Sequence, residues 1–119
     1  MEIKTVMKEI HDNAKAKGFW DKEKNFGEEL MLVVSELGEA LEAHRKKHKA
    51  NYNDFYENQA PYFVPSFEKF IKDTVEDELS DAVIRLFDLC QGLGIDLEWH
   101  IEQKMKYNAT RSKLHGKTY

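Results

Sequence analysis

Cysteine, proline and long apolar runs are all scarce in this 119-residue chain. Its single cysteine, Cys90, cannot form an intrachain disulfide and reads as a small core residue, which favours a cytoplasmic setting. The longest apolar run, Leu30 to Val34, is far shorter than the roughly 20 residues of a transmembrane helix. Charges interrupt the apolar residues of MEIKTVMKEI, which excludes a signal peptide. We therefore expect a cytoplasmic protein without a membrane segment.

Strong charge of one sign is also missing, because the net charge is only -4. Such a mild value gives no general case for a nucleic-acid partner. The exception is the segment from Lys104 to Tyr119, which has five positive residues and no Asp or Glu. This basic segment could hold an anion, or it could complement the dipole of a helix end.

Apolar residues recur at helical spacing, and no segment alternates like a strand, which predicts a single all-α domain over residues 1–119 with four-helix-bundle architecture. We expect Asn25 and Ser66 to act as N-caps and Asp96 to begin the last helix. The expected helices cover about residues 3–17, 26–49, 66–91 and 96–111, with a loop over 50–65.

The loop over 50–65 holds both prolines and cannot be one regular helix. Its aromatic residues could pin it to the bundle, or one or two could reach a ligand base or a neighbouring subunit. These aromatics are Tyr52, Phe55, Tyr56, Tyr62 and Phe63.

The helix expected over 66–91 is apolar on more than one side, which favours burial in an oligomer. Its core stripe comprises Ile71, Val75, Leu79, Ala82, Leu86 and Leu89, and a further side carries Val83, Ile84 and Phe87.

Two pairs of acids have the i,i+3 spacing that places both members on one helix face: Glu36 with Glu39, and Glu78 with Asp81. The first pair shares its arc with small and apolar residues, where carboxylates are costly unless paired. Four acids facing one another across two packed helices would repel unless protons or cations lie between them. Oxygen-only ligands favour Mg²⁺, with Mn²⁺ as a possible substitute.

A basic strip in the last part of the chain supplies the groups that grip a polyphosphate. It comprises Lys104, Asn108 and Arg111, one helical turn apart, together with His115 and Lys117. A nucleotide hydrolase needs carboxylates to bind a metal ion and positively charged side chains to bind the phosphates. A di-iron bundle is rejected because no histidine has a glutamate three residues before it, and no P-loop motif occurs.

Three segments together resemble the MazG-like group of all-α nucleoside triphosphate pyrophosphohydrolases: SELGEALEAHRK, EDELSDAVIRLFDL and KMKYNATRSKLHGKTY. The resemblance covers the chain except residues 50–66. It implies Mg²⁺-dependent cleavage of a nucleoside triphosphate to the monophosphate and pyrophosphate, by a homodimer or homotetramer. Ser80 stands where relatives often have Gly or Ala. The competing interpretation is a non-catalytic helical module that binds a nucleotide or a partner protein.

By the same resemblance, the four acids are metal ligands, and Glu36 or Glu39 also steers the attacking water. Lys104 and Asn108 match positions that contact phosphates or ribose. Further substrate contacts are implied for Arg111, His115 and Lys117. Trp20 lies where some relatives place an aromatic against the base, although an aromatic packed after the first helix explains it equally well.

Overall fold

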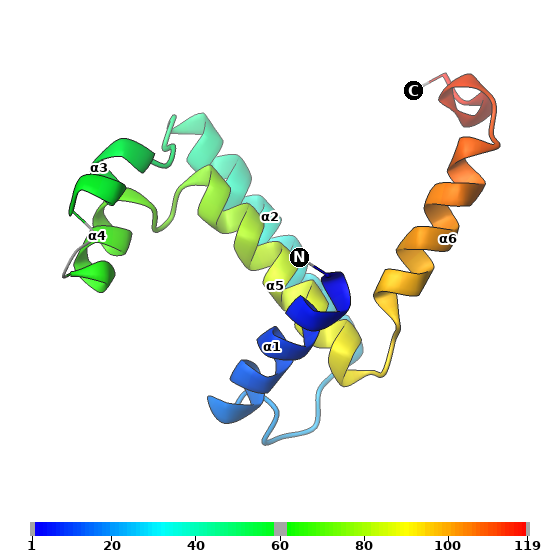
Figure 1. The fold of residues 1–119 in the computed structure, drawn as a ribbon, viewed down its shortest axis with the longest axis horizontal. Coiled ribbons are helices and arrows are strands. Elements are labelled where there is room, and N and C mark those ends of the chain that lie inside the picture. The colour runs from blue at the N-terminus through cyan, green and yellow to red at the C-terminus, as the bar shows by residue number, and fades with distance from the viewer. Residues whose placement is uncertain (1, 59–61, 119) are drawn as a thin grey trace. The chain divides into compact units, whose positions relative to one another are not determined.

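The computed structural model describes residues 2–58 and 62–118, which form six α-helices, one 3-10 helix and no strand (Figure 1). The prediction of an all-α fold is therefore confirmed. None of the helices in these two ranges is both long and apolar enough to cross a membrane. The elements are α1 (Ile3–Ala16), α2 (Phe26–Arg45), α3 (Tyr52–Asn58), α4 (Phe63–Phe70), α5 (Val75–Gly92), α6 (Leu97–Ala109) and η1 (Lys113–Gly116).

The chain divides into two compact units. Unit 1 combines Met1–Phe19 with Phe87–Tyr119, and unit 2 is Trp20–Leu86. Unit 2 therefore holds α2, α3, α4 and most of α5, including all four acids of the predicted metal site. The single-domain organisation and the four-helix bundle stay predictions.

Helix α2 begins as predicted, because the Asn25 side chain accepts a 2.9 Å hydrogen bond from the backbone N–H of Glu28. It ends at Arg45, four residues before the predicted end. Lys47 adopts a left-handed backbone with φ 58°, and the next amide, of His48, donates to the carbonyl of Ala43 at 2.9 Å. This backbone reversal closes the helix as a glycine usually would.

The predicted start of the third helix at Ser66 is wrong. Ser66 is buried inside α4, and its hydroxyl donates to the carbonyl of Phe55 at 3.2 Å. Helix α5 begins at Val75, after Thr74, which is only 1% exposed. The Thr74 hydroxyl accepts a 3.3 Å hydrogen bond from the Asp77 amide and so caps the first turn.

The predicted loop over 50–65 is wrong as an irregular segment, because it contains α3 and the start of α4, which pack against each other. The rings of Phe55 and Phe63 meet edge to face at 6.1 Å between centroids. This contact joins α3 to α4, and whether the aromatics pin the segment to the other helices stays a prediction. Residues 59–61 of the loop lie outside the described residues.

In unit 2 the buried apolar residues between α2 and α5 are small: Ala40, Ala43 and Ala82. Several larger apolar residues of these helices are exposed. Leu79, expected in the core, is 46% exposed, and that expectation is wrong within this chain. An exposed apolar surface therefore covers both helices, made of Leu30, Val34, Leu37 and Leu41 on α2 and Leu79, Val83 and Ile84 on α5.

Unit 1 is built on α1, the end of α5 and α6. Met7, Leu89 and Cys90 are its buried apolar residues among those described, which confirms Cys90 as a core residue. Asp96 caps α6 as predicted, because its side chain accepts a 3.1 Å hydrogen bond from the Trp99 amide. Helix α1 contacts α6, and the Lys4 ammonium lies 3.7 Å from the Asp96 carboxylate.

Candidate metal centre

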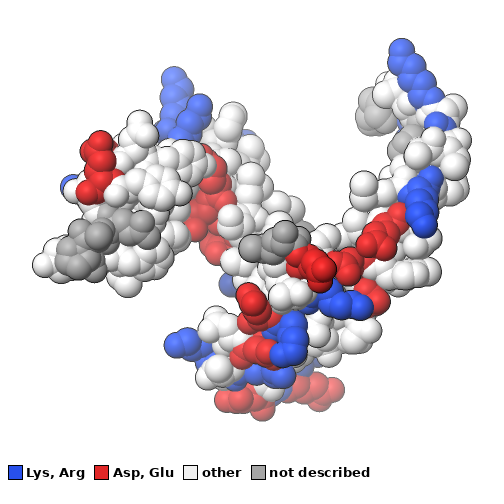
Figure 2. All heavy atoms as spheres, in the orientation of Figure 1, with Lys and Arg blue, Asp and Glu red and all other residues white. Residues whose placement is uncertain are grey.

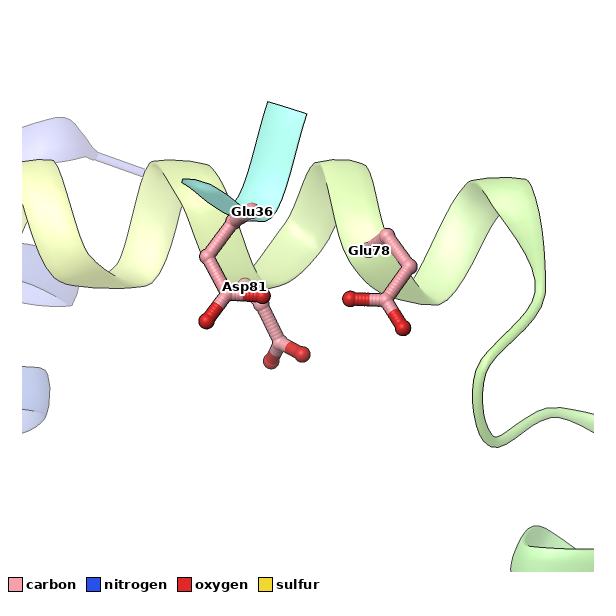
Figure 3. Close-up of side chains that lie close together, drawn as sticks. All are labelled: Glu36, Glu78 and Asp81. Carbon is pink, nitrogen blue, oxygen red and sulfur yellow. The ribbon is translucent and has the colours of Figure 1, made fainter. Parts of the chain in front are cut away.

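Three of the four predicted acids converge between α2 and α5. Glu36, Glu78 and Asp81 each offer one carboxylate oxygen, and these atoms all lie within 4.8 Å of one another. Figure 3 shows the side chain of Glu36 beside those of Glu78 and Asp81, which lie on α5. In Figure 2 acidic atoms gather over the first part of α5. Because i,i+3 spacing fixes Glu78 and Asp81 on one face, the approach of α2 suffices to complete the group.

The burial of these acids makes the group chemically unusual. Glu36 is 8% exposed and Glu78 is 6% exposed, while Asp81 is half-buried. Among the described residues, the buried oxygen Oε2 of Glu78 has no hydrogen-bond partner. A buried carboxylate oxygen without a donor is costly, and either a proton on the carboxyl group or a bound cation removes that cost. The donor set, which is oxygen only, fits a hard divalent ion such as Mg²⁺.

The protein shifts the pKa values of the three acids in different directions. Burial, with the neighbouring Glu39 and Glu36 carboxylates, raises the pKa of Glu78 to about 8. Burial and the negative charges of Asp77 and Glu36 also raise the pKa of Asp81. With a pKa of about 8, Glu78 holds a proton at neutral pH when no cation is bound.

Glu36 is the exception, and its partner was missed in the sequence. Burial acts to raise the pKa of Glu36, but hydrogen bonding, led by that from Arg85, outweighs burial and lowers it. The Arg85 Nε donates to Glu36 Oε1 at 2.8 Å. Arg85 lies four residues after Asp81, on the same face of α5, so the spacing alone places it beside the acids.

Glu39 takes a different place from the other three acids. It is exposed, and it does not belong to the group whose oxygens lie within 4.8 Å. It lies close enough to Glu78 to contribute to the raised pKa of that residue, and it lines the same cavity. The prediction of Glu39 as a direct ligand therefore stays a prediction, and Glu39 faces solvent more than the others.

A second acidic group shares Glu78 and adds Asp73 and Asp77. Fewer of its carboxylate oxygens are available to bind an ion. Asp77 Oδ2 accepts a 2.9 Å hydrogen bond from the Asp73 amide, and the Asp73 carboxylate lies 3.4 Å from the Lys72 ammonium. These contacts account for Asp73 and Asp77 as part of the structure at the start of α5. We therefore assign no ion to this second group.

The predicted phosphate-binding residues lie on and after α6, in unit 1. The Lys104 ammonium and the Arg111 guanidinium lie 5.2 Å and 5.5 Å from the centroid of the Tyr107 ring. The buried oxygen Oδ1 of Asn108 has no hydrogen-bond partner in the described part of the chain. Lys117 is exposed. Their joint action with the acids of unit 2 stays a prediction.

Two further predicted residues complete the set. His115 falls in η1, but its side chain lies outside what the structure describes. Trp20 belongs to unit 2 and is half-buried, with the Lys24 ammonium 5.0 Å from the centroid of its ring. A cation over an indole face is a stabilising contact, and both interpretations of Trp20 stay predictions.

A cavity of about 720 Å³ lies against the acids in unit 2. All four predicted metal ligands line it: Glu36, Glu39, Glu78 and Asp81. The candidate centre is therefore open to a ligand of small-molecule size on one side.

Comparison with protein-family models, with curated proteins and with solved structures finds no match. The resemblance to MazG-like enzymes consequently rests on the residues quoted above.

Proposed function

We propose that this protein is a Mg²⁺-dependent nucleoside triphosphate pyrophosphohydrolase of the MazG-like type. One observation carries the proposal: the buried, unpartnered Glu78 Oε2 stands beside the carboxylates of Glu36 and Asp81. A solvated helix face would place such acids in water, and a core would pair them with donors. Converging carboxylates, one of them buried with a raised pKa, are typical of a functional site and would suit a cation.

Glu36, Glu78 and Asp81 would hold the ion, with Glu39 at its solvent side. When bound, Mg²⁺ would offset charge on the phosphates and polarise water. Arg85 takes one oxygen of Glu36, which leaves the second for the ion. Glu39, exposed at the edge of the cavity, is the carboxylate best placed to accept a proton from water.

The proposed reaction is a hydrolysis between the α- and β-phosphates. The oxygen of water bonds to one phosphorus, the bond from that phosphorus to the bridging oxygen breaks, and the proton of water passes to Glu39. The products are a nucleoside monophosphate and pyrophosphate. The basic strip of Lys104, Asn108, Arg111, His115 and Lys117 would hold the phosphates, as the resemblance implies.

The test is a panel of common and modified nucleoside triphosphates, with and without Mg²⁺, in which released pyrophosphate is measured. We expect metal-dependent release from at least one member and none in EDTA. Activity with Mn²⁺ in place of Mg²⁺ is expected as well. A folded protein that releases no pyrophosphate from any member would favour the competing function, a non-catalytic nucleotide- or partner-binding module.

We also propose that the active form is a homodimer or homotetramer. The support is the exposed apolar surface of α2 and α5, where Leu37, Leu41 and Val83 are 47%, 52% and 48% exposed. Apolar surface on two adjacent helices is typical of a subunit interface. Sedimentation equilibrium measures the mass directly. Leu41→Glu should shift the protein toward the monomer. Leu114→Glu, which changes a leucine of unit 1 that is 59% exposed, should not.

A further inference from the structure

The cavity beside the acids is also lined by apolar and aromatic side chains. Its volume is about 720 Å³. Besides the acids of α2 and α5, its lining includes the side chains of Tyr52, Phe67, Ile71 and Ile84. Tyr52 belongs to α3 and Phe67 to α4, so the pair of short helices that replaces the predicted loop supplies the aromatic part of the wall. The volume lies within the range of sites for drug-sized and nucleotide-sized ligands.

The aromatic wall is fixed to the helices that bear the acids. The Asn51 amide donates to the carbonyl of Phe70 at 3.0 Å, which joins the start of α3 to the end of α4. The Ala50 amide donates to the Glu76 carboxylate at 3.3 Å, and the Val75 amide donates to the carbonyl of His48 at 3.1 Å. These bonds join the segment that follows α2, residues 48–51, to the end of α4 and to the first turn of α5. The wall therefore has a defined position relative to the acids, as a specificity element requires.

The two kinds of side chain that line the cavity suit the two parts of a nucleotide. A charged phosphate chain needs the cation held by the acids, and an uncharged planar base needs an apolar or aromatic contact. Tyr52 is 55% exposed although it lines the cavity, so its ring has accessible surface for a ligand. Its neighbour Tyr56, one turn further along α3, is 72% exposed and does not line the cavity.

We propose that the α3–α4 pair forms the base-binding side of the site, with Tyr52 and Phe67 contacting the base of the nucleoside triphosphate. This inference rests on the proposed function, since it assumes a triphosphate whose phosphates lie at the acids. It assigns the base contact to the segment between the two acidic helices and not to Trp20, which does not line this cavity.

The test compares Tyr52→Ala with Tyr52→Phe, Phe67→Leu and the matched control Tyr56→Ala. The substrate is the best nucleoside triphosphate of the panel, and inorganic tripolyphosphate, which has no base, serves as a competing ligand. For Tyr52→Ala we expect a KM about tenfold higher, a kcat within about twofold and an unchanged inhibition constant for tripolyphosphate. Tyr52→Phe, which keeps the ring, should restore KM, and Phe67→Leu should raise it.

Unchanged KM in both Tyr52→Ala and Phe67→Leu, in variants with native circular dichroism, would overturn the inference while leaving the hydrolase function intact. An equal loss of tripolyphosphate binding, or an equal effect in Tyr56→Ala, would also overturn it. If the native protein hydrolyses no triphosphate, the proposed function fails by itself. Calorimetric titration with Mg²⁺ and the same nucleotides then decides the inference: binding that Tyr52→Ala weakens supports the pocket, and absence of binding contradicts it.

Discussion

The guanidinium of Arg85 on α5 donates a 2.8 Å hydrogen bond from Nε to Oε1 of Glu36 on α2. The Glu36 side chain is 11% exposed and the Arg85 side chain is 43% exposed, so the pair lies at the border of the acidic group. It links the two helices where their acids would otherwise repel. In the metal-free protein, Arg85 thus compensates the charge of the buried Glu36 carboxylate.

Replacing Arg85 should therefore destabilise the metal-free protein and increase its demand for a cation. We expect Arg85→Gln to lower the free energy of unfolding in EDTA by about 1 kcal/mol, since Glu36 then lacks its charged partner. Added Mg²⁺ should raise the Tm of this variant more than that of the native protein, because a positive charge beside the ion has been removed. Thermal unfolding by circular dichroism, in EDTA and in Mg²⁺, measures both effects.

Arg45→Gln is the matched control. Arg45 lies at the end of α2, where its ion pair with Glu42 is 3.9 Å long and exposed at both ends. Such surface pairs contribute little, so its stability and Mg²⁺ response should remain native. An identical Mg²⁺ response in the two variants would show that Arg85 plays no part in the centre.

The two glutamates Glu39 and Glu78 should separate chemistry from metal binding. Glu39→Gln should abolish turnover, because the carboxylate that accepts the proton is lost, and it should leave the helical content intact. Glu78→Gln should abolish turnover and also weaken Mn²⁺ binding at least tenfold, because a buried ligand is lost. Calorimetric titration with Mn²⁺ and pyrophosphate release are the two measurements. Unfolding of Glu39→Gln would instead mark this acid as structural.

The pH dependence of stability follows from the raised pKa of Glu78. In the folded, metal-free protein this pKa is about 8, whereas the ordinary value is 4.5. The folded state therefore binds more protons than the unfolded state between these values, and its stability falls as the pH rises from about 4.5 to about 8. Urea unfolding in EDTA across this range should show the decline. Saturating Mg²⁺ should make the decline in stability with pH smaller. Glu78→Gln should remove the contribution of Glu78 to this decline.

A constant stability of the metal-free protein from pH 5 to pH 8 would contradict the raised pKa. The raised pKa also requires that Mg²⁺ bind more tightly as the pH rises toward 8, because the ion competes with a proton for Glu78.

The left-handed backbone at Lys47 offers a test of the fold. Its φ of 58° is unfavourable for a side chain with a Cβ, and glycine adopts it without strain. We expect Lys47→Gly to raise the free energy of unfolding by about 0.5–1 kcal/mol, as measured by urea denaturation. Lys49→Gly, two residues on, has no such strain to relieve and should give no gain. A loss of stability in Lys47→Gly would mean that α2 ends elsewhere.

Local patterns predicted the helices and their caps well where one signal dominated. Asn25 and Asp96 were identified because a capping side chain acts within three residues. The start of α5 was misplaced because the apolar spacing continues backward through Ile71. The residue that caps the helix is Thr74, whose hydroxyl accepts a hydrogen bond from the Asp77 amide. Lys47 gave no signal, since lysine rarely takes a left-handed backbone.

The candidate site was predicted in part for the same reason. Spacing alone placed Glu78 and Asp81 on one face, and the small residues around Glu36 indicated its burial. The exposure of Glu39 depends on the rotation of α2 against α5, which packing determines and spacing does not. The spacing also places Arg85 on the face of Glu78 and Asp81, but its hydrogen bond to Glu36 depends on the position of α2.

The most direct test of the central claim is a crystal structure of the protein grown with Mn²⁺, with anomalous scattering recorded at the manganese edge. We predict an anomalous peak bonded to oxygens of Glu36, Glu78 and Asp81, with Arg85 still on the other oxygen of Glu36. Manganese bound elsewhere, with these three carboxylates turned apart and no peak between them, would contradict the proposed centre.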